Sequence, residues 1–432
     1  MNYTQTLEYL FTSMPSFQNV GSDAYKPGLE RITEFCRHLG NPQRHFYTIH
    51  VAGTNGKGSV SHILASILRE AGYCVGLYTS PHLNDFRERV RIDGTKIPKQ
   101  TVVNFVGRHQ RKMEELDLSF FEMTTALAFD YFAHHDVEVA IIETGLGGRL
   151  DATNIITPIL SVVTNVALEH KAYLGDTLPK IAAEKAGIIK KSVPVVLGER
   201  HAEYDHIFME RTTALNSPLL FAEQHFSSLD QKPSASGQVF TLKRIADGYI
   251  FSLEIDLAGS YQRQNLITAS TAADYLHRCT PLSISRRAYV EGIASAAAST
   301  SLKGRWQRLS DTPLTICDTG HNPHSLKLIA EQIAATPHQK LYCVLGFASD
   351  KEVGEILPHF PAEAHYIFTQ PNSERAMPAS ELKEQASRFG LEGEVCCNVA
   401  EAVSHARSLA KEEDMIFVGG SNFVVAEIEE LF

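Results

Sequence analysis

The first strong pattern in the chain is a short β-rich run followed by a helical one. Residues 47–51 predict a strand, and apolar side chains within residues 60–68 recur at the i, i+3, i+4, i+7 and i+8 spacing of a helix. Gly72 follows at the place of a helix C-cap glycine. The stretch that joins the two runs, residues 50–59, reads HVAGTNGKGS. The pattern therefore predicts a strand, a glycine-rich turn and a helix, in that order.

This turn has the features of a phosphate-binding loop. Backbone N–H groups and a helix N-terminus converge there, and Gly53, Gly56 and Gly58 let an anion approach the backbone closely. Lys57 can reach the outer phosphates, and Ser59 offers a hydroxyl to phosphate or magnesium. A strict Walker A motif has Ser or Thr directly after the lysine, whereas here Gly58 intervenes. The alternative is a glycine-rich turn without a ligand, but the convergence of Gly, Lys and Ser favours a nucleoside triphosphate.

Two further strands are predicted to end in side chains that suit a metal ion. Residues 73–79 lead to Ser80, and residues 137–142 lead to Glu143. In an open α/β sheet such strand ends lie near the phosphate-binding loop. A carboxylate in the position of Glu143 is typical of magnesium sites in P-loop proteins, whereas a serine alone is usually a turn residue. The glycines after Glu143 do not make a dinucleotide fingerprint, because the third glycine would fall at Leu150.

A histidine and a lysine in the next units have ordinary structural interpretations. Residues 159–166 predict a strand that ends near His170, which taken alone is more often a satisfied polar residue than a ligand. Residues 178–186 predict a short helix, and Lys185 lies near its end, where a cation suits the helix dipole. Neither pattern by itself establishes chemistry.

The second half of the chain predicts another α/β domain. Residues 198–237 look irregular, and residues 238–255 alternate like a hairpin. Two helices follow, and then a new series of strands alternates with helices, at residues 314–317, 341–345, 366–369 and 415–418. We therefore predict an α/β protein with a P-loop parallel-sheet ATPase domain over residues 1–308. A smaller, Rossmann-like C-terminal α/β domain is predicted over residues 309–432.

Composition narrows the class of protein. The 432 residues are 44% hydrophobic and 21% charged, which is typical of a globular protein with two or three domains. The net charge of -10 argues against a nucleic-acid partner. Seven scattered cysteines without a CxxC pair suggest buried, reduced thiols in the cytoplasm. The N-terminus does not resemble a signal peptide, and no apolar run reaches transmembrane length, so no membrane association is expected.

Several ordered blocks carry a resemblance to a known family. The chain is similar to the folylpolyglutamate synthases and bifunctional dihydrofolate synthases of the Mur ligase superfamily. The matching blocks are GLERI (28–32), AGTNGKGS (52–59), TSPHL (79–83), ETGLGGRLDATN (143–154), EKAGII (184–189), GRWQ (304–307), DTGHNP (318–323), DKE (350–352) and GGSNFVVAE (419–427).

The resemblance implies an ATP-dependent amide ligase. Such an enzyme phosphorylates a carboxylate of its acceptor, and the amine of L-glutamate then attacks the acyl phosphate. The expected acceptors are dihydropteroate and reduced folates, and the alternative is a synthase that accepts folates only. A nucleotide switch and a Mur-type ligase acting on an amino-sugar nucleotide fit the sequence less well, since it lacks an NKxD motif and a matching N-terminal substrate domain. A monomer is expected from the family.

The resemblance also implies roles for individual residues. The predicted catalytic residues are Lys57, Lys185 (which the family carries as a carbamate) and His321. Two Mg²⁺ ions are expected, with the ligands Ser80, Glu143 and His170. The predicted ATP contacts are Gly53, Thr54, Asn55, Gly56, Lys57, Gly58, Ser59, Asn265, Arg305 and Asp318. The predicted contacts to the pterin-bearing substrate are Lys26, Pro27, Phe121, Glu122, Leu150, Asp151 and Ala152.

The chain departs from the family pattern at three places. It has DTGHNP where the family commonly has DGAHNP, and Leu168-Glu169-His170 where the family has LDH. Both departures keep the residue to which a function is assigned. The turn-rich loop at residues 21–27 is less typical, and by resemblance it lies where dihydropteroate binds; from its pattern alone it is a surface loop.

Overall fold

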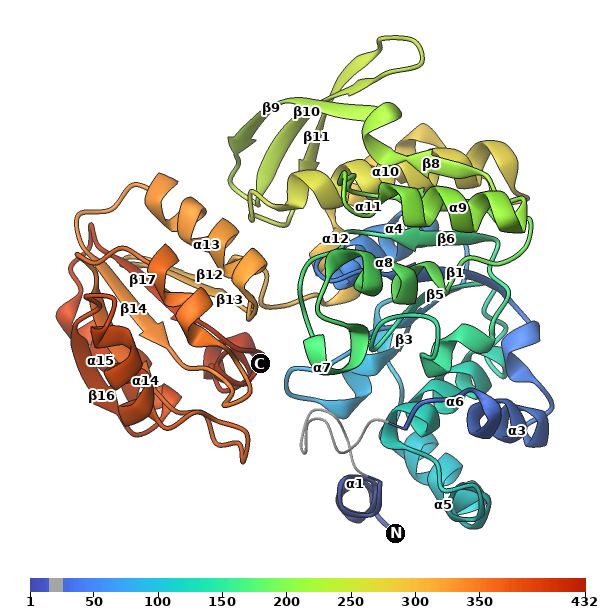
Figure 1. Cartoon of the computed structure of the whole chain (residues 1–432), viewed down its shortest axis with the longest axis horizontal. Coiled ribbons are helices and arrows are strands. Elements are labelled where there is room, and N and C mark those ends of the chain that lie inside the picture. The colour runs from blue at the N-terminus through green and yellow to red at the C-terminus, as the bar shows by residue number, and fades with distance from the viewer. Residues whose placement is uncertain (15–25) are drawn as a thin grey trace. The chain divides into compact units, whose positions relative to one another are not determined.

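The computed structural model describes residues 1–14 and 26–432. Residues 21–25 of the expected turn-rich loop therefore lie outside the described part. The chain forms two compact units (Figure 1). The first consists of Met1–Asp256 and Gln262–Leu302, and the second of Leu257–Tyr261 and Lys303–Phe432. The chain thus enters the second unit briefly before it returns to complete the first.

The first unit is built on an eight-stranded sheet in the order β4-β3-β2-β5-β1-β6-β7-β8. All neighbouring strands are parallel except at one edge, where β3 is antiparallel to both β2 and β4. The predicted parallel sheet is therefore confirmed, with β1 near its centre. The strands are β1 (Tyr47–Ala52), β2 (Val75–Tyr78), β3 (Val90–Ile92), β4 (Thr95–Lys96), β5 (Val139–Glu143), β6 (Leu160–Val163), β7 (Val195–Leu197) and β8 (Leu219–Phe221).

In the first unit, helix α4 falls where the sequence shows apolar residues at helical spacing. Ten consecutive residues of α4, from Ser59 to Leu68, are buried, because this helix packs against strands β1, β2 and β5 and also against α10, α11 and α12. The helices are α1 (Tyr3–Ser13), α3 (Glu30–His38), α4 (Lys57–Glu70), α5 (Lys99–Glu115), α6 (Phe120–Ala133), α7 (Lys171–Leu174), α8 (Leu178–Ala186), α9 (Asp205–Leu215), α10 (Gln262–Cys279), α11 (Arg286–Ala294) and α12 (Ala296–Thr300).

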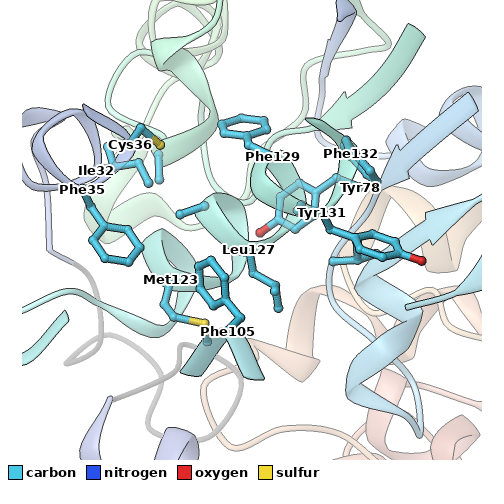
Figure 2. Packing of buried hydrophobic residues seen from close by; sticks show 14 of the residues in the cluster. Ile32, Phe35, Cys36, Tyr78, Phe105, Met123, Leu127, Phe129, Tyr131 and Phe132 are labelled. Atoms are coloured by element: carbon cyan, nitrogen blue, oxygen red, sulfur yellow. The ribbon is translucent and has the colours of Figure 1, made fainter. Parts of the chain in front are cut away.

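The helix α6 forms the centre of one core cluster. It is apolar almost all round, and a helix of that kind must be covered on every side. Figure 2 shows its side chains between those of α3, such as Phe35 and Cys36, and Tyr78 of β2. The start of α6 is held by a capping box, in which Ser119 and Glu122 each bond the other's backbone N–H.

The region expected to be irregular is in fact ordered. Residues 198–237 include helix α9 and strand β8 and lead into β9 (Phe226–Pro233). β9 pairs with β10 (Gln238–Arg244), which pairs with β11 (Ile250–Ile255), in a three-stranded antiparallel sheet. The hairpin prediction is confirmed, but the irregular one is wrong. Only Phe208 and Thr212 of α9 are buried, and most of β9 is partly or fully exposed, so neither had a clear apolar pattern.

The second unit contains a six-stranded sheet in the order β12-β13-β17-β14-β15-β16, parallel except for the edge strand β12. Alternate residues of its strands belong to two different core clusters, so both faces of the sheet are covered. The predicted smaller α/β domain is thereby confirmed. Its elements are β12 (Gln307–Asp311), β13 (Leu314–Asp318), α13 (Pro323–Ala335), β14 (Leu341–Leu345), β15 (His365–Thr369), α14 (Ala379–Ser387), β16 (Gly393–Cys396), α15 (Val399–Leu409), β17 (Met415–Gly419) and α16 (Asn422–Ala426).

The crossing segment Leu257–Tyr261 is attached to the second unit by side-chain hydrogen bonds. Gln332 of α13 accepts from the backbone N–H of Ser260 at 2.7 Å and donates to the carbonyl of Ala258 at 3.0 Å. The Tyr261 hydroxyl donates to Asp318. All seven cysteines are free thiols, but only Cys36, Cys317 and Cys343 are buried, so the prediction of buried thiols is wrong for the other four. Among the described residues, no helix combines the length and the apolar character needed to cross a bilayer.

Candidate active site

The predicted phosphate-binding loop lies at the carboxyl edge of the first sheet. β1 leads directly into it, and the neighbouring strands β5 and β6 run parallel to β1. Val51 is in register with Glu143, so the acidic end of β5 lies beside the start of the loop. Tyr78 of β2 is in turn in register with Ile142, which brings Ser80 to the same edge. The structure therefore gathers these predicted residues as the sheet pattern implied.

Two glycines of this loop have conformations and neighbours that exclude a side chain. Gly53 has φ +152°, and an added Cβ would lie 1.8 Å from Thr164 Oγ1. Gly56 has φ +81° and caps α4, and its Cβ would lie 2.2 Å from Asn265 Oδ1. Both positions need glycine because the backbone and other side chains approach closely. Asn265 thus lies against the loop, as its predicted ATP role requires.

A loop that the sequence analysis did not assign holds the P-loop (residues 53–59) in shape. The backbone N–H of Asn55 donates to Asn165 Oδ1 at 2.9 Å, and Thr164 Oγ1 donates to the Asn55 carbonyl at 2.6 Å. Thr54 Oγ1 accepts from the Ala167 N–H at 3.0 Å. The segment after β6 is therefore a scaffold for the P-loop. Thr164 and Asn165 gave no sequence signal, since their role depends on long-range contacts.

The remaining P-loop side chains lie close to their own backbone and to α10. Lys57 Nζ donates to the carbonyls of Gly53 at 2.8 Å and Thr54 at 3.1 Å. Gln262 Nε2 donates to Ser59 Oγ at 3.2 Å, and Gln262 Oε1 accepts from Asn265 Nδ2 at 2.8 Å. Gln262 is thus a further residue of the site that sequence reasoning did not single out. It connects two predicted nucleotide contacts.

The variant Gly56→Ala is expected to lower the affinity for ADP at least about tenfold, because the new Cβ must displace Asn265 from the P-loop. The control is Gly72→Ala, after the other end of α4, where φ is +94° but no heavy atom lies within 4 Å of the added Cβ. Both variants carry backbone strain, so the difference between their ADP affinities, measured by calorimetric titration, reports the clash with Asn265 alone. Equal affinities for the two variants would contradict this account of the loop.

The predicted metal ligands Ser80 and Glu143 are neighbours. The Ser80 N–H lies 3.3 Å from Glu143 Oε2, and Glu143 is 3% exposed. The buried guanidinium of Arg89 is close enough to interact with the Glu143 charge, and it donates to His82 Nδ1 at 2.8 Å. Burial, together with the Arg89 charge, lowers the pKa of His82 well below its ordinary value. At this edge of the sheet, Glu143 therefore lies near a polar N–H group and a cation.

This donor set fits magnesium in one particular way. Within residues 1–14 and 26–432, no group of three or more His, Cys, Asp and Glu side chains could hold a metal ion by itself. Mg²⁺, however, usually binds through one or two carboxylates, with the other positions taken by water and substrate phosphates. One buried carboxylate beside a serine and a P-loop meets that requirement. His170, with φ +44°, is the N-cap residue of α7.

Lys185 is fully buried and forms an ion pair. Its Nζ lies 2.7 Å from Glu169 Oε1, although Lys185 is in the last turn of α8. Burial lowers the pKa of Lys185, against the opposing effect of Glu169. Burial alone would raise the pKa of Glu169, but the charges of Lys185 and Lys57 outweigh it and lower the value to about 2. Glu169 is therefore a site residue that the sequence analysis had not assigned.

The variant Glu169→Gln is expected to reduce the free energy of unfolding by about 3 kcal/mol at neutral pH, since it leaves a buried ammonium without its anion. The folded-state pKa of Glu169 is below its ordinary 4.5, so the contribution is present above pH 4.5 and is lost as pH falls toward 2. Urea unfolding in CO2-free buffer at pH 7 and pH 3 measures this. Glu184→Gln, in an exposed pair with Arg149, is the control. Equal losses in both variants would refute the expectation.

The predicted acceptor-binding residues divide into two groups. Lys26 pairs with Asp117 at 2.7 Å, and Arg31, which was not predicted, lies 3.1 Å from the buried carboxylate of Glu122. Pro27 is exposed beside them. The second group surrounds the loop after β5: Phe121 lies against Gly145, Asp151 bonds that loop, and Leu150 and Ala152 flank Asp151.

Three predicted residues of the second unit lie around one turn. The buried Asp318 carboxylate accepts from the backbone N–H groups of Trp306 and Gly320, each at 2.7 Å. Arg305 donates to the Thr319 hydroxyl, and His321 Nδ1 lies 3.0 Å from the Thr319 carbonyl. Burial raises the pKa of Asp318, and Arg305 opposes this shift. The DTGHNP turn therefore presents a charged cluster at the carboxyl end of β13.

A P-loop at the central strand, a buried acid at the next strand end and a second α/β unit are features of a two-domain, nucleotide-binding P-loop protein. The model of the Mur ligase middle domain matches residues 51–273, and that of the Mur ligase glutamate ligase domain matches residues 304–422. The chain therefore belongs to the Mur ligase family, which confirms the resemblance.

Three relatives illustrate the similarity. Folylpolyglutamate synthase from Lacticaseibacillus casei is 35% identical over 88% of this chain and 88% of its own length. Dihydrofolate synthase/folylpolyglutamate synthase from Escherichia coli is 32% identical over 96% of this chain and 93% of its own. The structure of E. coli FolC in complex with DHPP and ADP matches with a TM-score of 0.84 at 30% identity, covering 100% of this chain and 97% of that one.

Proposed function

We propose that this protein is an ATP-dependent ligase that adds L-glutamate to dihydropteroate, forming dihydrofolate, and to reduced folates, forming polyglutamates. The observation that carries the proposal is the P-loop beside Glu143, in a chain that matches both the middle and the glutamate ligase domains of the Mur family. Full-length similarity to enzymes named for both activities favours the bifunctional function over a synthase for folates only.

The chemistry begins with a carboxylate, which is a poor electrophile at neutral pH. A carboxylate oxygen of the acceptor attacks the γ-phosphorus of ATP, the bond to the β-phosphate oxygen breaks, and ADP leaves. The amine of L-glutamate then attacks the acyl phosphate, an amide forms, and phosphate departs while the nitrogen loses its proton. In such a reaction, positioning and charge neutralisation supply most of the rate enhancement.

The P-loop residues hold the nucleotide in this scheme. The N–H groups at the start of α4 and the small residues Gly53, Gly56 and Gly58 admit the phosphates, with Thr54 and Asn55 shaping the loop. Lys57 turns from the loop carbonyls to the outer phosphates, and Ser59 contributes its hydroxyl. We assign Asn265, Arg305 and Asp318 to further nucleotide contacts and His321 to the acyl-phosphate step, on the resemblance of their motifs.

Ser80, Glu143 and His170 are the residues that would hold Mg²⁺. Bound Mg²⁺ neutralises charge on the phosphates during transfer. Within the protein, Glu143 is buried, and the guanidinium of Arg89 is close enough to interact with its carboxylate. Two ions are proposed, on the resemblance of the motifs that contain these three residues.

Lys185 has two alternative states in this proposal. As an ammonium it pairs with Glu169. Reaction of its neutral amine with CO2 would form an N–C bond and release one amine proton to solvent, giving a carbamate. The carbamate is an anion and cannot keep that ion pair. The burial that lowers the pKa of Lys185 increases the neutral fraction that can react. The carbamate would then favour metal binding where the ammonium opposes it.

The acceptor is proposed to bind at Lys26, Pro27, Phe121, Glu122, Leu150, Asp151 and Ala152. Phe121 offers an aromatic face to the flat pterin, and Lys26 offers a cation. A single chain carries every residue assigned here, so we propose that it acts as a monomer. Seven free thiols support a cytoplasmic location.

The test is ADP release in the presence of ATP, Mg²⁺ and L-glutamate, with dihydropteroate or tetrahydrofolate as the acceptor. Release with both acceptors is the expected result. Release with tetrahydrofolate alone would establish the folate-only alternative, and release with neither would refute the proposal.

A further inference from the structure

A chain of buried hydrogen bonds connects the centre of β1 with the loop after β5. His50, in the middle of β1, is fully buried, and its Nε2 lies 2.8 Å from Thr153 Oγ1. Thr153 belongs to a 3-10 turn, η4 (Ala152–Ile155), and its hydroxyl donates to Asp151 Oδ1. Asp151 Oδ2 then accepts from the backbone N–H groups of Gly145 and Leu146, each at 2.8 Å.

The direction of each bond follows from the donors present. Asp151 also accepts from the Thr153 N–H at 3.0 Å, so three of its partners are backbone donors. Burial raises the pKa of the Asp151 carboxyl, and these hydrogen bonds oppose that shift and favour the carboxylate. The single hydroxyl proton of Thr153 is used toward Asp151, and the His50 Nε2–H must therefore donate to Thr153. Burial, together with the nearby Lys190, lowers the pKa of His50 to about 3, which keeps the ring neutral in this tautomer.

This series of hydrogen bonds ends at the surface where the acceptor is proposed to bind. Gly145 lies between the Asp151 carboxylate and the Phe121 ring; a Cβ at Gly145 would be 2.5 Å from that ring. The loop also starts directly after Glu143 and Thr144. A shift of Asp151 would therefore release the Gly145–Leu146 backbone and change how the Phe121 face is presented. The three side chains that form this series of hydrogen bonds, those of His50, Thr153 and Asp151, are each at least nine-tenths buried.

We propose that Thr153 and His50 are positioning residues for pterin binding, which orient the Asp151 carboxylate so that it holds the Gly145–Leu146 loop against Phe121. This inference rests on the proposed function, since the pterin ring is taken as the ligand of that surface. The four oxygen contacts of Asp151 are all used within the protein. Within the proposed acceptor site, Asp151 therefore also fixes the neighbouring loop.

The first test is Thr153→Val, which keeps the shape of the side chain and removes the hydroxyl. The KM for dihydropteroate and for tetrahydrofolate is expected to rise about tenfold, since one buried, charge-assisted bond is lost. The KM for ATP and the affinity for ADP are expected to stay unchanged, because the P-loop has separate supports in Thr164 and Asn165. Thr153→Ser, which retains the hydroxyl, is expected to restore the acceptor KM.

A matched control removes another buried threonine hydroxyl. Thr212 of α9 donates only within its own helix, to the Phe208 carbonyl at 2.8 Å and the Met209 carbonyl at 3.0 Å. Thr212→Val is expected to leave the KM for both acceptors unchanged. A second pair of variants tests His50, at the other end of this series of hydrogen bonds. His50→Leu removes the donor to Thr153 and is expected to raise the acceptor KM. His50→Gln supplies an amide N–H and is expected to restore the acceptor KM.

The outcomes separate this inference from the proposed function. If the wild-type protein turns over an acceptor and Thr153→Val and His50→Leu both leave the acceptor KM unchanged, the positioning role is refuted. It is also refuted if the KM for ATP rises as much as that for the acceptor, because the residues would then act on the whole site. If the wild-type protein uses neither acceptor, it is the proposed function that fails. Should Thr153→Val fail to fold, the His50 pair decides.

Discussion

Replacing Glu143 with glutamine is expected to reduce ATP-dependent ligation at least about 1,000-fold, which corresponds to roughly 4 kcal/mol of lost transition-state stabilisation. The change keeps the size of the side chain but removes the one carboxylate that ends β5 beside the P-loop. Without that charge the site loses its proposed oxygen ligand for Mg²⁺, and the buried Arg89 then favours anions there instead. The measurement is the initial rate of ADP release with a saturating acceptor and L-glutamate.

A matched control lies just before the same strand. Glu138 precedes β5 and accepts from the Cys74 N–H at 2.9 Å on the exposed side of the molecule. Glu138→Gln removes the same charge far from the carboxyl edge and is expected to keep the rate. Circular dichroism verifies that both variants retain the fold. A Glu143→Gln enzyme with near-normal turnover would remove Glu143 from the metal site.

Replacing Lys185 with alanine is expected to lower the ligation rate about 100-fold or more. The side chain is fully buried, and its loss leaves both a cavity and an unpaired Glu169. If the active state is the carbamate, a small carboxylate such as propionate is expected to enter the cavity and restore part of the rate. An ammonium role predicts no such rescue by an anion.

The control for this experiment is Lys180→Ala in the same helix, whose exposed side chain pairs with Asp176. It is expected to keep wild-type activity. Carbon-13 NMR of the wild-type protein in labelled bicarbonate reports the carbamate directly. Unchanged activity of Lys185→Ala would show that Lys185 has no role in the reaction. Loss of activity without rescue would favour the ammonium over the carbamate as the active form.

The catalytic edge of the first sheet could be predicted from the sequence because it depends on local patterns. A β-rich run, a glycine-rich turn and a helical run specify β1, the P-loop and α4. Strand ends at Ser80 and Glu143 then follow from the parallel order, in which carboxyl ends share an edge. The roles assigned to the individual residues rest on the resemblance and remain predictions.

The supporting residues could not be predicted in the same way. Asn165 and Gln262 reach the P-loop from segments more than 100 residues away. The ion pair of Lys185 gave no signal either, because a lysine in the last turn of a helix normally lies in solvent and favours the dipole. Such roles arise from tertiary contacts, which a single sequence does not contain.

The brief passage of the chain through the second unit could not be predicted either. The segment Leu257–Tyr261 is five residues long, and it is held there by Gln332 and Asp318 rather than by an apolar pattern of its own. Strand β9 was missed because most of its residues are polar and partly or fully exposed, so it has no clear apolar alternation. Its structure depends on pairing with β10. Polar segments that gain structure through pairing are the ones that periodicity overlooks.

The most direct measurement follows the oxygen atoms of the acceptor. Dihydropteroate labelled with oxygen-18 in its carboxylate is incubated with the enzyme, ATP, Mg²⁺ and L-glutamate, and the released phosphate is analysed by mass spectrometry. An acyl phosphate leaves one acceptor oxygen on phosphate, so labelled phosphate is predicted in equal amount to the amide formed. Amide formation with unlabelled phosphate, or ADP release without an amide, would contradict the account.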